Sequence, residues 1–241
     1  MVDANNTLKQ LQVAYVEAFS SSQIRNRVGV ILEVLPHGQV DFVQAYFEEG
    51  KRDNLDEYYH LALLGMSHQE ILCREKACFN ALYERMLHGL LEDATHWSPE
   101  DTLISKVLLY LNVEEANRMG QPFDFDLWRQ STIINIQPIR APYFLSTDHS
   151  IGNKMVVHME DAALLGNMTF KEKQKFFLDC ADDKLAQSAQ FIHTLRLFHE
   201  YQDWNEVSVV ENKVNIVRQF RSDFKKLYEE LNRRKRGRYK C

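Results

Sequence analysis

The side chains with the clearest chemical potential are the cations near the C-terminal end of the chain. Residues 233–240 read RRKRGRYK, and two adjacent lysines precede them. Clustered cations bind phosphates because binding releases counterions from a nucleic acid, and a tyrosine ring can stack on a base. The predicted nucleic-acid contacts are Lys225, Lys226, Arg233, Arg234, Lys235, Arg236, Arg238, Tyr239 and Lys240.

Two other interpretations of this basic run stay open. It has the composition of a nuclear localisation signal, and also that of a solvated tail with no specific partner. From Arg218 onward, ten Lys and Arg stand against three acidic residues, which leaves a net charge of +7 there and -12 in the remainder. The two parts of the chain are therefore expected to meet different partners.

One pair of residues has the spacing of a carboxylate-bridged metal site. Glu57 and His60 form a Glu-x-x-His pair, which di-metal helical bundles use twice, with further glutamates. We find no second pair with this spacing, and the groups His158, Glu160, Asp161 and His193, His199 have no matching set elsewhere. We therefore predict no catalytic, metal or cofactor residue, and keep a metal-dependent helical-bundle enzyme as an alternative.

The sequence also lacks the short motifs of the common enzyme classes. It contains no P-loop, no G-x-G-x-x-G, no G-x-S-x-G and no H-E-x-x-H, so phosphate cradling, dinucleotide binding and serine or zinc hydrolysis have no support. The four cysteines are scattered without a C-x-x-C pair, which is typical of reduced, structural thiols; they are Cys73, Cys78, Cys180 and Cys241. We predict a protein that binds partners and is not an enzyme.

The elements that position these residues are expected to be helices. Only 9 Gly and 5 Pro are available to punctuate strands, and apolar residues recur at helical spacing over much of the chain. The fold class is therefore all-α, a bundle of about nine to eleven helices. Helices are predicted at 7–19, 40–47, 55–64, 67–90, 98–111, 156–165, 169–180, 182–201 and 205–234. A further helix is predicted to begin at an N-cap among Ser20, Ser21 and Ser22 and to end at residue 35.

Some predicted helices have start signals. Ser67 and Glu70 match the capping-box pattern, and residues 98–101 read SPED, which places an N-cap, a proline and two carboxylates at a helix start. In the last helix an apolar seam either packs within the fold or forms a homodimer. The seam consists of Val210, Val214, Val217, Phe220, Phe224, Leu227 and Leu231.

The helical pattern weakens between residues 121 and 153, where β-branched residues, three prolines and a glycine occur. We predict an irregular connector or short hairpin near 130–153. The expected organisation is an N-terminal helical bundle at 1–120, a connector at 121–153, a C-terminal helical segment at 154–232 packed on the first, and a basic tail at 233–241.

No apolar window approaches the length of a membrane span, and residues 1–12 do not resemble a signal peptide. We therefore expect a cytoplasmic protein without a membrane partner, with ribonucleoprotein granules and the nucleus left open as locations.

Three stretches resemble a known helical region. They read VEAFSSSQIR at 16–25 with VDFVQAYFE at 40–48, ISKVLLYL at 104–111, and LLGNMTFKEKQ at 164–174. They are similar to the helical region before the SAM domain in the zinc-finger CCHC-domain proteins numbered two and fourteen, which is related to the PHAT domain of Smaug. The zinc knuckle and the SAM domain of that family are absent from this sequence.

The resemblance implies a PHAT-like, non-enzymatic adaptor in post-transcriptional RNA regulation. Its implied partners are proteins of ribonucleoprotein assemblies, including a non-canonical cytoplasmic poly(A) polymerase. It implies no position-specific binding residue. Since the body of the chain is acidic, an immunity- or effector-type protein that blocks one basic target is a further alternative.

Overall fold

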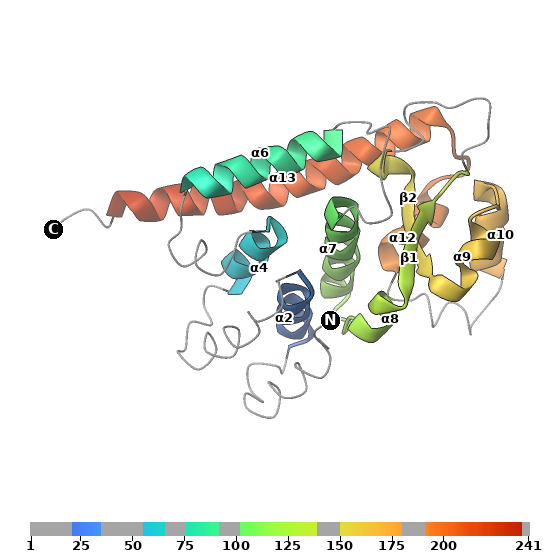
Figure 1. Ribbon diagram of the computed structural model, residues 1–241, viewed down its shortest axis with the longest axis horizontal. Coiled ribbons are helices and arrows are strands. Elements are labelled where there is room, and N and C mark those ends of the chain that lie inside the picture. The colour runs from blue at the N-terminus through green and yellow to red at the C-terminus, as the bar shows by residue number, and fades with distance from the viewer. Residues whose placement is uncertain are drawn as a thin grey trace. The chain divides into compact units, whose positions relative to one another are not determined.

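The computed structural model describes residues 21–34, 55–65, 76–91, 102–138, 150–179 and 191–237. Within these ranges it contains nine α-helices and one two-stranded sheet (Figure 1), so the predicted all-α, multi-helix fold is confirmed. The chain divides into two compact units, Met1–His88 with Ile216–Cys241, and Gly89–Asn215. Two of the three predicted boundaries, at residues 120 and 153, lie inside the second unit.

Several predictions lie outside the described residues. They are the helices at 7–19 and 40–47, the capping box of Ser67 and Glu70, the start signal at 98–101, and Cys73, Cys180 and Cys241. For Cys78 and for residues 231–237 the structure describes the backbone alone.

The first unit contains α2 (Ser22–Val34), α4 (Leu55–Leu63), most of α6 (Lys76–Leu91) and the C-terminal part of α13 (Glu206–Gly237). The helix predicted to begin among Ser20, Ser21 and Ser22 is confirmed as α2, and the helix predicted at 55–64 is confirmed as α4. Helix α2 packs against α4 and buries Val28, Val30 and Ile31. Arg27 of α2 forms an ion pair with Asp56 of α4, which ties the polar edges of the two helices.

The second unit is built around a small antiparallel sheet. Strand β1 (Ser131–Asn135) pairs with β2 (Lys154–His158), with Ile133 opposite Val156. The backbone N–H of Val156 donates to Thr194 Oγ1 at 3.2 Å, and that hydroxyl donates back to Val156 O at 3.2 Å. A threonine hydroxyl therefore satisfies both backbone groups of Val156, which point away from β1.

Strand β2 corrects one prediction. Residues 156–165 were expected to form one helix, but they form the end of β2, the 3-10 turn η4 (Met159–Asp161) and the short helix α9 (Ala162–Leu165). The β-branched Val156 and Val157 suit a strand, and pairing with β1 supplies backbone hydrogen bonds that a helix would otherwise make locally. The predicted connector at 121–153 therefore contains β1, while β2 begins directly after the connector.

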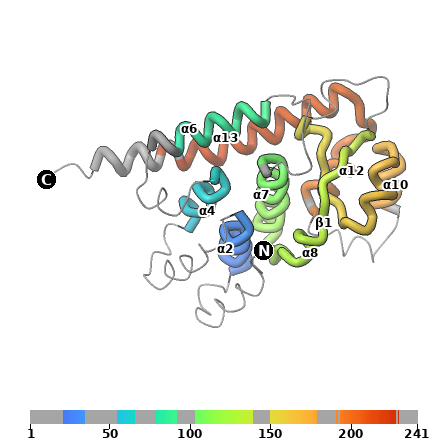
Figure 2. The backbone as a smooth tube through the Cα atoms, in the orientation of Figure 1, coloured from blue at the N-terminus to red at the C-terminus, as the bar shows by residue number. Residues whose placement is uncertain are grey.

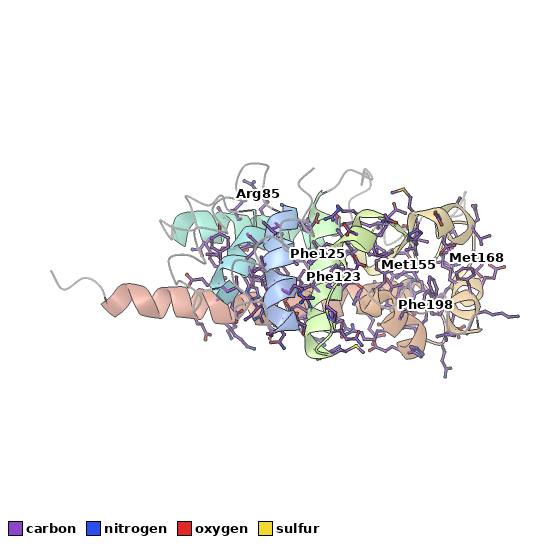
Figure 3. The ribbon with its side chains drawn as sticks, turned by 90° about the horizontal axis from the view of Figure 1, so that it is seen from below. Arg85, Phe123, Phe125, Met155, Met168 and Phe198 are labelled. Carbon is purple, nitrogen blue, oxygen red and sulfur yellow. The ribbon has the colours of Figure 1, made fainter. Side chains whose placement is uncertain are left out.

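Helices surround this sheet. They are α7 (Thr102–Arg118), α8 (Phe125–Arg129), α10 (Phe170–Asp179), α12 (Ile192–Glu200) and the first turns of α13. The core between the sheet and the helices includes Met155 of β2 and Phe198 of α12, which Figure 3 labels. The ring of Phe198 lies 5.4 Å from that of Phe170 and 5.2 Å from that of Phe177. Phe123 and Phe125, also labelled, meet edge to face at 5.0 Å.

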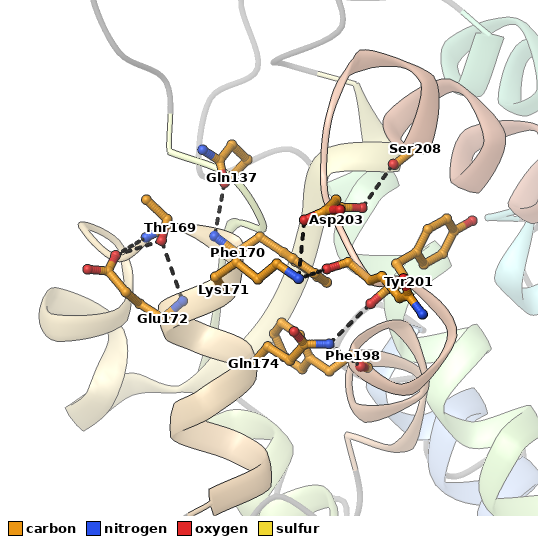
Figure 4. Close-up of polar contacts among 11 residues, drawn as sticks. Gln137, Thr169, Phe170, Lys171, Glu172, Gln174, Phe198, Tyr201, Asp203 and Ser208 are labelled. Carbon is orange, nitrogen blue, oxygen red and sulfur yellow. Dashed lines mark hydrogen bonds and ion pairs between the residues drawn. The ribbon is translucent and has the colours of Figure 1, made fainter.

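Helix α10 begins with a capping box that agrees with the predicted start at residue 169. Thr169 N–H donates to Glu172 Oε2 at 2.7 Å, and Glu172 N–H approaches Thr169 Oγ1 at 3.4 Å (Figure 4). Gln174 donates from its side-chain nitrogen to Phe198 O at 2.7 Å and to Tyr201 O at 3.1 Å. The C-terminal carbonyls of α12, which lack partners within the helix, thereby receive a donor from α10.

The helix predicted over 182–201 is also corrected. Phe191 has a non-helical backbone at φ -86° and ψ 45°, and α12 starts only at Ile192; residues 182–190 lie outside the described part. The backbone N–H of His193 donates to Asn112 Oδ1 of α7 at 3.1 Å. A side chain 81 residues away thus caps the helix where no local capping residue is present.

Helix α13 confirms the long helix predicted at 205–234, but its buried face differs from the predicted seam. Val217, Phe220, Phe224 and Leu227 are buried as expected, whereas Val210 and Val214 are 42% and 46% exposed. Val209, Asn212 and Ile216 are buried in that part of the helix instead. The reason is tertiary, because the backbone of Gly152 packs against α13 beside Val209 and Lys213.

Candidate nucleic-acid interface

The apolar face of α13 in the first unit is held by aromatic packing. Figure 2 traces α6 beside this part of α13. The ring of Phe220 lies 4.1 Å from that of Phe224, and Tyr83 of α6 stacks near both, at 6.3 Å and 6.1 Å. His60 of α4 meets Phe224 edge to face at 5.1 Å. These contacts fix which side of α13 is covered and which is exposed.

The opposite side of this helix is exposed and basic. Arg218, Arg221 and Lys225 follow one another at i, i+3 and i+7, which places them on one face, and all three are exposed, as is Lys226. At a rise of about 1.5 Å per residue, Arg218 and Lys225 are separated by about 10 Å along the helix axis. We call these four residues the basic face of α13.

The basic face contains two of the predicted nucleic-acid contacts, Lys225 and Lys226. Arg233, Arg234, Lys235 and Arg236 belong to α13 with only their backbone described, and Arg238, Tyr239 and Lys240 lie outside the described residues. The sequence-based list omitted Arg218 and Arg221. Helical periodicity could have identified Arg218 and Arg221, because their spacing places them off the helix face that carries the buried Phe220 and Phe224.

The electrostatics of this region follow from its cations. Burial raises the pKa of the Tyr83 hydroxyl. The nearby Arg221 partly opposes this increase, and Glu84 adds to it. A positive face of this kind attracts phosphate groups, and neutralising them releases counterions.

The side chains of the predicted Glu57–His60 pair lie among residues of the helical fold. His60 Nδ1 lies 2.7 Å from the backbone oxygen of Asp56, and its ring contacts Tyr59 and Phe224. Glu57 is 8% exposed. In the ranges that the structure describes, no group of three or more His, Cys, Asp or Glu side chains could hold a metal ion.

The second His-acid group is a helix cap. Nδ1 of His158 accepts from the backbone N–H of Glu160 at 3.4 Å, at the start of η4. Asp161 precedes α9 and makes no side-chain cap to it. The closeness of His158 and Glu160 therefore follows from this local cap.

Another buried titratable cluster joins α7 and α12. His193 is 1% exposed, and neither ring nitrogen has a hydrogen-bond partner among the described residues. Burial, followed by the nearby Arg196, lowers the pKa of His193 from 6.5 to about 3. A base this weak is poorly matched to proton transfer near neutral pH.

Glu115 completes this cluster. It is 4% exposed and accepts from Arg196 Nη1 at 2.6 Å, while Arg118 pairs with its other oxygen. Two guanidinium groups therefore compensate a buried carboxylate, which is the usual condition for burying a charge.

Among the helices described here, none is both long and apolar enough to cross a membrane. Comparisons with protein-family models, with curated proteins and with solved structures found no match. The resemblance to the PHAT-like helical region therefore stays a prediction from the sequence.

Proposed function

We propose that this chain is a non-enzymatic helical adaptor that contacts RNA through the basic face of α13. The observation that carries the proposal is the segregation of α13 in the first unit. Its aromatic side is covered by Tyr83 and His60, and its opposite side presents Arg218, Arg221 and Lys225. A rigid row of cations contacts successive phosphates with less loss of conformational freedom than a flexible tail would.

The basic run that follows extends the same proposal. Arg233 and Arg236 lie at i+8 and i+11 from Lys225 in the same helix, beyond the exposed Glu229 at i+4, so their positions return to the basic side. Backbone phosphates are recognised without regard to sequence. The adaptor accordingly binds single-stranded RNA with low base selectivity and strong dependence on salt.

The test is fluorescence anisotropy with a labelled oligouridine, measured over a series of salt concentrations on the full chain. The variants are Lys225→Gln alone and Arg221→Gln with Lys225→Gln. Each lost phosphate contact lowers the slope of log K against log salt by about 0.7 for a single strand. The matched control is Lys175→Gln, which removes an exposed lysine from α10.

The expected result is weaker binding and a shallower slope for the α13 variants, with the Lys175 variant unchanged. RNA affinity and salt slope that are identical in all three variants contradict the proposal. The protein partners implied by the resemblance, a poly(A) polymerase among them, are tested separately by co-purification with candidate RNA-processing proteins, and recovery of none counts against that part.

A further inference from the structure

The two strands of the sheet differ in how their outer edges are completed. Among the described residues the sheet has two strands, so β1 and β2 each have one edge without a neighbouring strand (Figure 1). At the edge of β2, the Thr194 side chain bonds both backbone groups of Val156. The central residues of β2 are buried, whereas every residue of β1 is partly exposed. The accessible edge of the sheet is therefore that of β1.

The pairing of the strands identifies the backbone groups on the β1 edge. Ile133 lies opposite Val156, whose own N–H and C=O face Thr194. In an antiparallel pair, two opposite residues either bond each other or both point their backbone groups outward. The N–H and C=O of Ile133 therefore point away from β2. Those of Ser131 and Asn135 do the same, because outward residues alternate along a strand.

The open part of this edge is short. At one end Nζ of Lys173 donates to Asn135 O at 2.7 Å, which closes the edge there. No described residue bonds the outward backbone N–H or C=O of Ser131 or Ile133. These two donors and two acceptors are therefore the groups that β1 offers to another strand.

The sequence of this edge lacks the features that protect strand edges from pairing. Such edges usually carry a charged side chain, a proline or a bulge. Strand β1 reads STIIN, and residues 130–139 contain no charged residue; Pro138 lies beyond the strand. The register with β2 is continuous, without a bulge. A second copy of the same strand therefore meets no like charge when it pairs with β1.

The open backbone groups of β1 are complementary to themselves. When two antiparallel copies pair with Thr132 opposite Thr132, Ser131 of each copy lies opposite Ile133 of the other. The N–H and C=O of both residues then exchange hydrogen bonds, so every open group is used. Centring the pair on Ile133 would instead place Ser131 opposite Asn135, whose oxygen already has a donor.

We propose that the β1 edge pairs with the β1 edge of a second copy of this chain, in antiparallel register about Thr132. Among the described residues the sheet offers one open edge, so pairing about a two-fold axis stops at two copies. A contact through one short strand belongs to the small, transient class of interfaces, under about 1,200 Å². The association is therefore weak. It involves no residue of the basic face, so dimer formation and RNA binding are tested separately.

Sedimentation equilibrium of the full chain tests the pairing, at concentrations from the micromolar range to about 1 mM. The parent is expected to be monomeric at the low end and increasingly dimeric at the high end. Ile133→Pro removes an outward N–H and should weaken association about tenfold or more, since proline is tolerated where an edge N–H points away from the ladder. Ile133→Val keeps the N–H and the β-branching, and should associate like the parent.

A charge exchange at Thr132 tests the register. Thr132→Lys and Thr132→Glu should each stay monomeric over the same range, because like charges then lie directly opposite each other. An equimolar mixture of the two variants should form dimers again, because opposite charges face each other across the two-fold axis. Added salt should weaken this mixed dimer.

A parent that stays monomeric up to about 1 mM overturns the proposal. The proposal also fails if Ile133→Pro is folded, by circular dichroism and thermal unfolding, and still forms the dimer of the parent. If that variant does not fold, the mixture of charged Thr132 variants decides, and the absence of mixed dimers rejects the register.

A last control concerns the exposed valines of α13. Val210 and Val214 are 42% and 46% exposed, and they are a second apolar surface through which two copies could associate. Val210→Thr with Val214→Thr should leave the dimer unchanged. A dimer that is lost in this variant is formed by α13 and contradicts pairing through β1.

Discussion

The side-chain oxygen of Asn153 accepts a hydrogen bond from the indole N–H of Trp204 at 3.1 Å, across 51 residues of sequence. The same oxygen accepts from the backbone N–H of Gln137 at 2.9 Å, and the Asn153 amide nitrogen donates to Gln137 O at 3.0 Å. Asn153 is fully buried. One amide therefore joins the ends of both strands to the segment that enters α13.

Replacing Asn153 by alanine should destabilise the protein by about 3 kcal/mol. The change leaves the indole N–H and both backbone groups of Gln137 without this partner, and a buried unsatisfied group costs about 1–3 kcal/mol. Urea unfolding followed by tryptophan fluorescence measures the effect. Asn167→Ala is the control, because that side chain bonds Ala163 O at an exposed position; equal losses in both variants would contradict this role.

Gly152→Ala should cost about 3 kcal/mol or more, because overpacking against fixed backbone is not relieved by a rotamer change. A Cβ at residue 152 would lie 2.1 Å from Val209 O and 3.1 Å from Lys213 N. The comparison is Gly120→Ala, where φ is +67° but nothing lies within 4 Å. There only the left-handed backbone is penalised, by about 1–2 kcal/mol. Denaturant midpoints of the two variants test the order.

Stability should depend on the protonation of His193 in acid. Its pKa falls from 6.5 to about 3 on burial beside Arg196, so below pH 6.5 the unfolded chain binds a proton that the folded chain refuses. Above pH 6.5 this difference in proton binding does not lower the free energy of unfolding. As pH falls from 6.5 toward 3, the free energy of unfolding decreases by up to about 1.4 kcal/mol per pH unit.

His193→Leu removes this dependence, since leucine does not titrate. The free energy of unfolding of the parent, measured at several pH values, should therefore fall more steeply between pH 6.5 and pH 4 than that of the variant. His199→Gln, at an exposed position of the same helix, should retain the slope of the parent. Parallel curves for the parent and His193→Leu would refute the prediction.

Lys173→Met should destabilise the second unit by about 1–3 kcal/mol near neutral pH. Nζ of Lys173 donates to Asn135 O at 2.7 Å and to Ile136 O at 2.8 Å, and buried carbonyls that lose their donor are penalised. Lys175→Met, at an exposed position of α10, should change stability little. Chemical denaturation of the two variants distinguishes them.

The same lysine predicts a pH effect in alkali. Burial lowers the pKa of Lys173 from 10.5 to about 8, partly opposed by Glu172, so between these values the unfolded chain holds the extra proton. The free energy of unfolding of the parent, relative to that of Lys173→Met, should therefore rise as pH increases from 8 to 10.5. The gain should disappear when the pH is lowered again to 8. A constant difference over this range would contradict it.

The helical class and the positions of several helices could be predicted from local pattern. Helices α4, α10 and α13 begin within one residue of the predicted starts, and α2 begins at Ser22, one of the three serines predicted to cap it. Apolar spacing and capping residues such as Thr169 are local signals. The exposed positions of Lys225 and Lys226 follow from the same periodicity, since each is out of phase with Phe220 and Phe224.

The tertiary structure decided what the local pattern left ambiguous. Val156 and Val157 fit either a helical stripe or a strand, and only pairing with Thr132 and Ile133 selects the strand. The start of α12 depends on Asn112, and the exposure of Val210 and Val214 depends on where Gly152 approaches α13. Such contacts join residues far apart in the chain, and hydrogen-bond satisfaction and close packing between them carry no signature in a short sequence window.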